Sequence, residues 1–246
     1  MAVLTALPGA AAVFGDSLSS DTVQRHPLGT IAFDRQGGIY RYVLVGATAT
    51  VAGSLYQSPA PIANHLARTS PVVAVGAKSL TFTPGATAGA ANLYAEGYLQ
   101  VDTGAAAENG YMYLVSGHPA ITSSTAFTLT LQEAIAVALS GSSAIGLLQN
   151  PYSNVIVAPT TLTAQCAGFA VSVIAAGSYG WLKTRGPVAA LINGTPAVSA
   201  PVINSATTAG AVDVWTAAAQ PTAQAVGKMM QVGVSTKNNA VMALIE

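Results

Sequence analysis

The chain has 246 residues, of which 51% are hydrophobic and only 7% are Asp, Glu, Lys or Arg, and its formal net charge at pH 7 is zero. An ordinary soluble domain carries roughly 25% charged residues, so most of this surface must be built from uncharged side chains. The lack of a basic run in the sequence argues against nucleic-acid binding, and so little surface charge favours association with other protein.

Short strands dominate the predicted structure. Runs rich in β-branched and aromatic residues, mostly bounded by Gly, Pro, Asn or Ser, predict strands over 40–45, 79–83, 98–101, 127–131 and 155–157. Turn signals such as Asn109-Gly110 lie between them. Residues 131–139 fit either a short helix or parts of two strands. The expected fold is all-β, with small β-barrel or β-sandwich modules, little helix and an extended N-terminal arm.

A weak internal repeat suggests how the chain is divided. A Gly-aromatic turn followed by an aromatic strand occurs three times, with its second aromatic residue at Tyr42, Tyr113 and Trp181. Glycines and aromatic residues at turns could also recur by chance in any β protein. With the Pro, Ser and Thr residues near 66 and 158, the repeat predicts boundaries at these positions. The Ala/Gly-rich residues 1–25 are expected to form a flexible arm, followed by a first β module over 26–66, a middle β domain over 67–158 and a C-terminal β domain over 159–246.

Neither a membrane segment nor a disulfide is expected. The most apolar run, 134–148, is interrupted by Ser-Gly-Ser-Ser and is shorter than the ~20 residues of a spanning helix. Residues 1–13 contain no Lys or Arg, which argues against a signal peptide. Cys166 is the single cysteine, so it has no partner within the chain, and we expect it to be a small buried core residue.

Residues 14–18 (FGDSL) resemble the first signature block of the GDSL esterases and lipases, in which the serine is the nucleophile. A serine nucleophile needs a base, a group that orients the base, and donors for the oxyanion. In that family the base is a histidine near the C-terminus, three residues after an aspartate. Here the histidines are His26, His65 and His118, residue 115 is Val, and no Gly-x-Asn-Asp block occurs. We therefore expect the motif at Ser17 to be coincidental.

No other pattern in the sequence predicts a site. The histidines and Cys166 lack metal-ligand spacing, and the carboxylates form no close pair. Tyr179 and Trp181 could form a sugar or anion platform with Lys183 and Arg185, although basic residues at the solvent-exposed end of a strand are the simpler interpretation. We predict no catalytic, cofactor-binding or metal-binding residues, no cofactor, and a protein that is not an enzyme.

Two regions resemble a known class of proteins. Residues 26–57 (HPLGTIAFDRQGGIYRYVLVGATATVAGSLYQ) are similar to the opening of structural proteins encoded beside the major capsid protein in many tailed bacteriophages. From Thr81 to the C-terminus, five elements follow one another in the order found in those head proteins: TFTPGATAGAANLYAEGYLQV, NGYMYLVSGHP, NPYSNVIVAP, GSYGWLKTRGPVAALINGT and AGAVDV.

The resemblance implies a head decoration, or cement, protein. Such proteins bind the outside of an assembled icosahedral capsid, often as trimers, and clamp neighbouring capsomers without a catalytic site. The expected partners are the major capsid protein and further copies of this chain in a homotrimer, with neither nucleic acid nor a membrane. The expected location is the outer capsid surface of a virion made in the bacterial cytoplasm, which suits a lone cysteine. The arm over 1–25 would be a tether.

Two alternatives remain open. One is another phage structural component, such as a tail tube, a fibre or a minor head protein. The other, with less support, is a secreted GDSL-like esterase or a surface adhesin. A fibre should show a short repeat of fixed period and an enzyme a cluster of polar residues, and the sequence displays neither.

Overall fold

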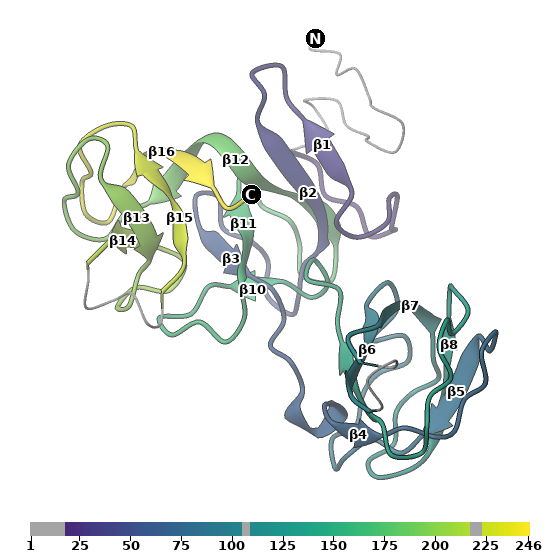
Figure 1. Cartoon of the computed structure of the whole chain (residues 1–246). Coiled ribbons are helices and arrows are strands. Elements are labelled where there is room, and N and C mark those ends of the chain that lie inside the picture. The colour runs from purple at the N-terminus through teal and green to yellow at the C-terminus, as the bar shows by residue number, and fades with distance from the viewer. Residues whose placement is uncertain (1–17, 105–108, 217–222) are drawn as a thin grey trace. The chain divides into compact units, whose positions relative to one another are not determined.

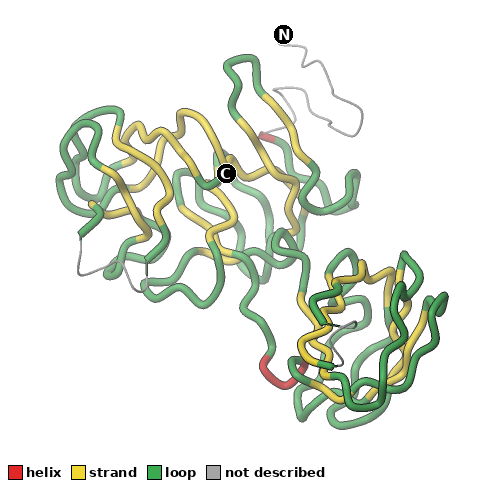
Figure 2. Tube along the Cα trace, viewed as in Figure 1, coloured by secondary structure: helices red, strands yellow, loops and turns green. Residues whose placement is uncertain are grey.

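The computed structural model describes residues 18–104, 109–216 and 223–246, and nearly all of their regular structure is β-strand. Within these ranges helix is limited to single turns such as Ala63–His65 (Figure 2), and no helix there is long and apolar enough to cross a membrane. The all-β prediction is confirmed. The chain divides into two compact units (Figure 1): unit 1 comprises Met1–Pro59 and Pro151–Glu246, and unit 2 comprises Ala60–Asn150.

Unit 1 is built on a ten-stranded antiparallel sheet. Its main path runs β10-β3-β11-β12-β16-β15-β13-β14, while β1 pairs with β2 and β2 pairs with β12. The strands are β1 (Ile31–Phe33), β2 (Ile39–Leu44), β3 (Leu55–Gln57), β10 (Ile156–Val157), β11 (Cys166–Ala170), β12 (Tyr179–Leu191), β13 (Pro201–Asn204), β14 (Val212–Val214), β15 (Ala225–Met229) and β16 (Asn238–Leu244).

The long strand β12 connects the two parts of this sheet. Its first half pairs with β2, where Trp181 lies opposite Tyr42, and its second half pairs with β16. Gly186 follows a shift in register against β2 and has a φ of +99°. A Cβ at this position would lie 3.0 Å from the Cα of Gly38, and a positive φ disfavours other residues. Glycine therefore lets the strand pass close to the β1–β2 turn and continue toward β16.

Backbone hydrogen bonds join the two ends of the sheet of unit 1. Strands β10 and β14 stand at the ends of the strand order. Gly210, shortly before β14, donates its N–H to the carbonyl of Ala158, just after β10, at 2.8 Å. The carbonyl of Gly210 in turn accepts the N–H of Leu55 at 2.8 Å. The curled sheet thus has its edges linked around a core that includes Leu55, Phe169, Val188, Val202, Val226 and Val241.

Unit 2 is a six-stranded antiparallel sheet that curls into a half-barrel (Figure 1). Its order is β4-β9-β6-β7-β8-β5. In β8, Phe127, Leu129 and Leu131 are buried and the two threonines between them are exposed, as expected for a strand with one face against a core. The strands are β4 (Arg68–Thr69), β5 (Ser79–Phe82), β6 (Tyr98–Thr103), β7 (Met112–Gly117), β8 (Phe127–Leu131) and β9 (Ala144–Leu148).

The observed units differ from the predicted division of the chain. Residues 26–59 are not a separate module, because β2 pairs with β12 and β3 with β11, which places them in one sheet with the C-terminal part. The middle unit covers 60–150 instead of 67–158, since β10 pairs with β3 in unit 1. Both differences come from strand pairs that are far apart in the sequence.

The predicted arm and repeat also differ from the structure. Residues 1–17 lie outside the described residues, but 18–25 belong to unit 1: Asp21 and Tyr179 exchange two backbone hydrogen bonds of 3.0 and 2.7 Å. The three repeated elements are the strands β2, β7 and β12. Strands β2 and β12 are neighbours in one sheet, whereas β7 lies in the other, so the repeat does not mark three equivalent modules. Residues 132–138 form neither a helix nor a strand.

Candidate functional site

The serine of the GDSL-like motif, Ser17, lies outside the described residues, so its predicted lack of catalytic function stays a prediction. All three histidines are described. His26 lies in unit 1, whereas His65 and His118 are buried in unit 2. Among the residues that the structure describes, no group of three or more His, Cys, Asp or Glu side chains could hold a metal ion.

The two histidines of unit 2 flank the buried Tyr94. His65 Nδ1 lies 2.5 Å from the Tyr94 hydroxyl oxygen, and His65 Nε2 lies 2.8 Å from the carbonyl oxygen of Thr87. A carbonyl can only accept, so Nε2 donates, and in a neutral ring Nδ1 then accepts the tyrosine proton. His118 Nε2 accepts the backbone N–H of Tyr94 at 3.0 Å, and Nδ1 donates to the carbonyl of Pro119 at 2.7 Å. These partners hold both rings in place.

This histidine–tyrosine cluster has no means of acting on a substrate. Burial lowers the pKa of His118 and raises the pKa of Tyr94, because it disfavours the charged form of each group. Every ring nitrogen and the hydroxyl already have a partner, and His65 and Tyr94 are 0% and 1% exposed. The cluster is structural. Its members are far apart in the sequence, which is why no spacing pointed to it.

Lys183 corrects a prediction made from the sequence. It was expected at the solvent-exposed end of its strand, but its side chain is 8% exposed and its Nζ lies 2.9 Å from Oδ2 of Asp34. Burial alone would raise the pKa of Asp34, but the hydrogen bonds from Lys183 and from the backbone N–H of Gly38 lower that pKa overall. Lys183 Nζ also lies 5.0 Å from the centre of the Tyr40 ring. Arg185 is exposed, as expected.

Tyr179 and Trp181 both contact Tyr42, but they do not form the open platform considered from the sequence. The ring of Trp181 lies 5.0 Å from that of Tyr42 and 5.6 Å from that of His26, and the residue is 3% exposed. Lys183 is occupied by Asp34. The four residues therefore do not gather around one ligand.

Cys166 is a buried core residue, as predicted, with 3% of its surface exposed. Burial raises the pKa of its thiol to about 12. The thiol therefore stays protonated at neutral pH, and the thiolate that a nucleophile or metal ligand requires does not form.

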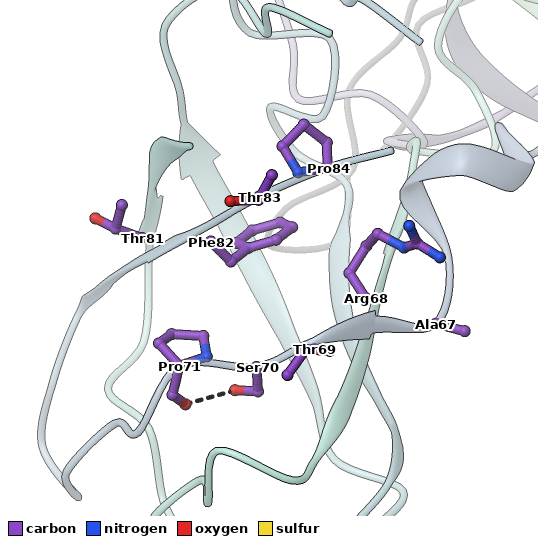
Figure 3. A pocket seen from close by; sticks show the side chains of 9 residues that line it. All are labelled: Ala67, Arg68, Thr69, Ser70, Pro71, Thr81, Phe82, Thr83 and Pro84. Carbon is purple, nitrogen blue, oxygen red and sulfur yellow. Dashed lines mark hydrogen bonds between the residues drawn. The ribbon is translucent and has the colours of Figure 1, made fainter. Parts of the chain in front are cut away.

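The candidate functional site is a groove on unit 2 between the two edges of its sheet. Strands β4 and β5 stand at opposite ends of the strand order, and a groove of about 470 Å³ lies between them, lined by residues 67–71 and 81–84 (Figure 3). One end of this edge groove is closed, because the N–H of Gly85 donates to the carbonyl of Asn64 at 2.6 Å. The exposed threonines Thr69 and Thr81 border its other part.

Strand β5 turns part of its backbone toward the edge groove. The N–H of Leu131 donates to the carbonyl of Lys78, and Thr81 lies opposite Thr128 in the same ladder. In an antiparallel pair, residues alternate between bonding the partner strand and facing away. Since Lys78 bonds toward β8, the backbone N–H and C=O of Thr81 point to the groove.

Strand β4 presents its backbone in the same way from the other side. The N–H of Ser70 donates to the carbonyl of Ser143 across the pair with β9, so by the same alternation the backbone groups of Thr69 face the groove. The Nε of Arg68 donates to the carbonyl of Leu66 at 2.9 Å. In Figure 3 its side chain extends from β4 toward the side on which Pro84 lies, which adds a charged donor at the rim.

The edge groove therefore offers unpaired backbone groups and an arginine, an arrangement suited to binding an extended peptide. A free sheet edge is a template for a further strand. The sequence predicted the strand over 79–83 but could not show that it is an edge, since this depends on the strand order.

No family model matches this chain, and neither a curated protein nor a solved structure matches it.

Proposed function

We propose that the chain is a structural protein of a tailed-bacteriophage virion that decorates the outer surface of the capsid and stabilises it by binding across neighbouring capsomers. The observation that carries the proposal is the edge groove, where two free strand edges are presented by a chain with only 7% charged residues. The similarity of residues 26–57 and of the elements after Thr81 to phage head proteins supports the same function.

Exposed apolar side chains beside the edge groove support an interface there. Val72 and Val75, in the segment between β4 and β5, are 81% and 62% exposed. Single exposed apolar residues are normal on a monomer, but here two lie on the segment that joins the free strand edges. Burying them would add apolar area to a contact whose backbone hydrogen bonds set the register. A standard interface buries about 1,600 Å², and repetition over a lattice multiplies a modest affinity.

In the proposed contact an extended segment of the capsid subunit lies along β5. Its backbone pairs with the N–H and C=O of Thr81, as in other cases of strand addition. The guanidinium group of Arg68 donates to a carbonyl or carboxylate of the same segment. Such a contact depends on shape and hydrogen bonding rather than on opposite charges, so it suits a chain whose net charge is zero.

The function is tested by mass spectrometry of purified virions and by binding of the purified protein to empty capsids. We expect the chain in the particles and saturable binding to the outside of the shell. Its absence from virions, together with no binding to shells, would exclude the decoration function.

The role of the edge groove is tested separately with Thr81→Pro and Thr81→Val. Proline removes the N–H that faces the groove but no hydrogen bond to β8, and edge strands tolerate it. Both variants lose the 2.7 Å hydroxyl contact with Thr128, so valine is the matched control. We expect Thr81→Pro to weaken shell binding at least about tenfold, or 1.4 kcal/mol, and Thr81→Val to bind like wild type. If both variants bound equally well, the contact with the capsid would have to lie elsewhere on the protein.

The proposed homotrimer is tested by sedimentation at low micromolar concentration. We expect a species of about three times the 24.6 kDa chain mass, because an uncharged surface favours self-association. A monomer alone would contradict the trimer but not the binding to the capsid.

A further inference from the structure

A second concave surface, on unit 1, has a different chemistry from the edge groove. It is a pocket of about 210 Å³ where residues 19–26 cross β2 and β12. Backbone hydrogen bonds between Asp21 and Tyr179, and one of 3.0 Å from the N–H of Arg25 to the Tyr42 hydroxyl, hold this segment in place. We call it the aromatic pocket; its principal lining residues are Asp21, Arg25, His26, Tyr42, Tyr179 and Trp181.

Four rings build the floor and one wall of the aromatic pocket. Tyr42 and Tyr179 stack with centroids 5.9 Å apart and planes 10° apart, and His26 packs edge-on against Tyr42 at 5.1 Å. Tyr42 and Trp181 are each 3% exposed, so they form the rigid floor. Tyr179 and His26 are only partly buried, and they present ring surface to a ligand.

Trp181 forms part of the floor of the aromatic pocket. The residue is 3% exposed and borders the pocket. Within the described residues, the buried side-chain nitrogen and oxygen atoms without a hydrogen-bond partner belong to Ser58 and Ser172, so the indole nitrogen is not a buried unpaired donor. A ligand in the pocket would lie against this indole and change its surroundings.

The charged groups at the rim decide what kind of ligand fits. Asp21 Oδ2 accepts from Arg25 Nε at 2.6 Å, so the rim carries one negative and one positive charge. A free anion would be repelled by Asp21 and a free cation by Arg25. A ligand with neutral hydroxyl groups can donate to the carboxylate and accept from the guanidinium group.

The volume of the pocket and its aromatic rings further limit which ligands can bind. Sites for drug-sized molecules run to roughly 300–1,000 Å³, and this pocket of about 210 Å³ is smaller. A sugar ring has an apolar face of C–H groups that can lie on an aromatic ring, with hydroxyl groups around its edge. Tyr179 supplies the ring, and Asp21 and Arg25 supply the polar partners.

We propose that the aromatic pocket binds one neutral sugar residue, such as the terminal residue of a surface glycan, with its C–H face against Tyr179 and its hydroxyl groups bonded to Asp21 and Arg25. The proposal does not depend on the edge groove, which lies in unit 2. A proline-containing peptide is the competing occupant, because aromatic grooves also bind such segments.

The chain allows a direct test, because Trp181 and Trp215 are its only tryptophans. In an amide NMR spectrum of the full chain, Trp215→Phe assigns the two indole N–H signals. Glucose, galactose, mannose and N-acetylglucosamine are then titrated, each as the free sugar and as the terminal residue of a short oligosaccharide. The highest sugar concentration is about 10 mM, ten times the value at which a site with a Kd of 1 mM is half occupied. We expect at least one sugar to shift the Trp181 signal saturably while the Trp215 signal stays in place.

Two variants distinguish specific sugar binding in the aromatic pocket from non-specific contact with the protein surface. Asp21→Asn removes the negative charge at the rim but keeps an acceptor, and Tyr111→Ala removes a 38% exposed tyrosine from unit 2 as a control. We expect Asp21→Asn to weaken sugar binding at least about tenfold, or 1.4 kcal/mol, with an unchanged melting temperature, and Tyr111→Ala to bind like wild type. No sugar-dependent shift of Trp181, a shift with a proline-containing peptide alone, or equal binding by Asp21→Asn would overturn the proposal.

Discussion

The two units of this protein end their curled sheets in different ways. In unit 1, backbone hydrogen bonds connect the two ends of the sheet. The N–H of Gly210 donates to the carbonyl of Ala158, and its C=O accepts from the N–H of Leu55. In unit 2 the segments before β4 and after β5 are joined by hydrogen bonds such as that between Asn64 and Gly85, and a groove of about 470 Å³ lies between β4 and β5. Joined edges leave few backbone groups for a partner, whereas free edges invite one.

The interiors of the units differ in a related way. Unit 1 buries an ion pair, Lys183 with Asp34. Unit 2 buries the cluster of His65, Tyr94 and His118, where burial disfavours the charged forms of His118 and Tyr94. A buried ion pair fails when one partner is lost. The buried cluster loses stability when one of its members becomes charged. We therefore expect substitutions in the ion pair to destabilise unit 1 and a change of pH to destabilise unit 2.

The largest expected effect is that of Trp181→Ala on unit 1. Removing a large buried aromatic side chain costs about 3–5 kcal/mol, a sizeable part of the 5–15 kcal/mol that typically stabilises a domain. We expect faster hydrogen exchange throughout unit 1 and unchanged exchange in unit 2, measured by mass spectrometry. A variant that melts like wild type would contradict the burial of Trp181.

Lys183→Ala should destabilise the same unit by roughly 3 kcal/mol. This is the low end of the cost of breaking a buried pair, because Asp34 keeps the backbone N–H groups of Gln36 and Gly38 as donors. Arg185→Ala, two residues along the same strand, should change stability by less than about 0.5 kcal/mol. Urea unfolding followed by tryptophan fluorescence reports unit 1, which holds both tryptophans.

A further change, Asp34→Asn, sharpens the prediction for Lys183. In the Lys183→Ala background it removes the unpaired charge, so it should recover part of the lost stability. If Asp34→Asn destabilised Lys183→Ala further, the loss would come from packing of the lysine stem instead of from the charge.

In unit 2, Tyr94→Phe should cost about 1–3 kcal/mol, because it leaves the Nδ1 acceptor of the buried His65 without a donor. The matched control is Tyr111→Phe, which changes a 38% exposed tyrosine of the same unit. Hydrogen exchange should rise in unit 2 and stay constant in unit 1. Similar effects of the two substitutions would mean that the hydroxyl contact of Tyr94 does not stabilise the fold.

The smallest expected effect is a fall in the stability of unit 2 on acidification. Burial lowers the pKa of His118 below its ordinary value of about 6.5. The neutral ring therefore contributes its full stability above about pH 6.5, and this is lost as the pH falls through the lowered pKa of the folded state. Protonation of His118 would place a hydrogen on Nε2, so that two donors would face each other and the hydrogen bond from the N–H of Tyr94 would be lost.

Exchange rates in unit 2, compared between neutral pH and about pH 5, measure this loss. His118→Gln keeps an acceptor but does not titrate, so it should flatten the profile. A profile for wild type that is already flat would exclude His118 as the source.

Local signals located several strands, and long-range pairing explains what was missed. The predicted strands at 79–83 and 127–131 match β5 and β8 to within one residue, because alternation and turn residues act over a few positions. Lys183 was placed wrongly because its partner Asp34 is 149 residues away. The aromatic pocket was missed for the same reason: Asp21 and Arg25 lie in the segment predicted as an arm, and only the folded sheet brings them to β12.

The position of unit 2 within the sequence of unit 1 has a consequence for folding on the ribosome. All strands of unit 2 come from the continuous stretch 60–150, whereas β2 and β3 of unit 1 must wait for β12 and β11. Contacts between residues so far apart in sequence form slowly. Strands β2 and β3 therefore emerge without these partners while unit 2 folds, and they are the part of the nascent chain most in need of protection from aggregation.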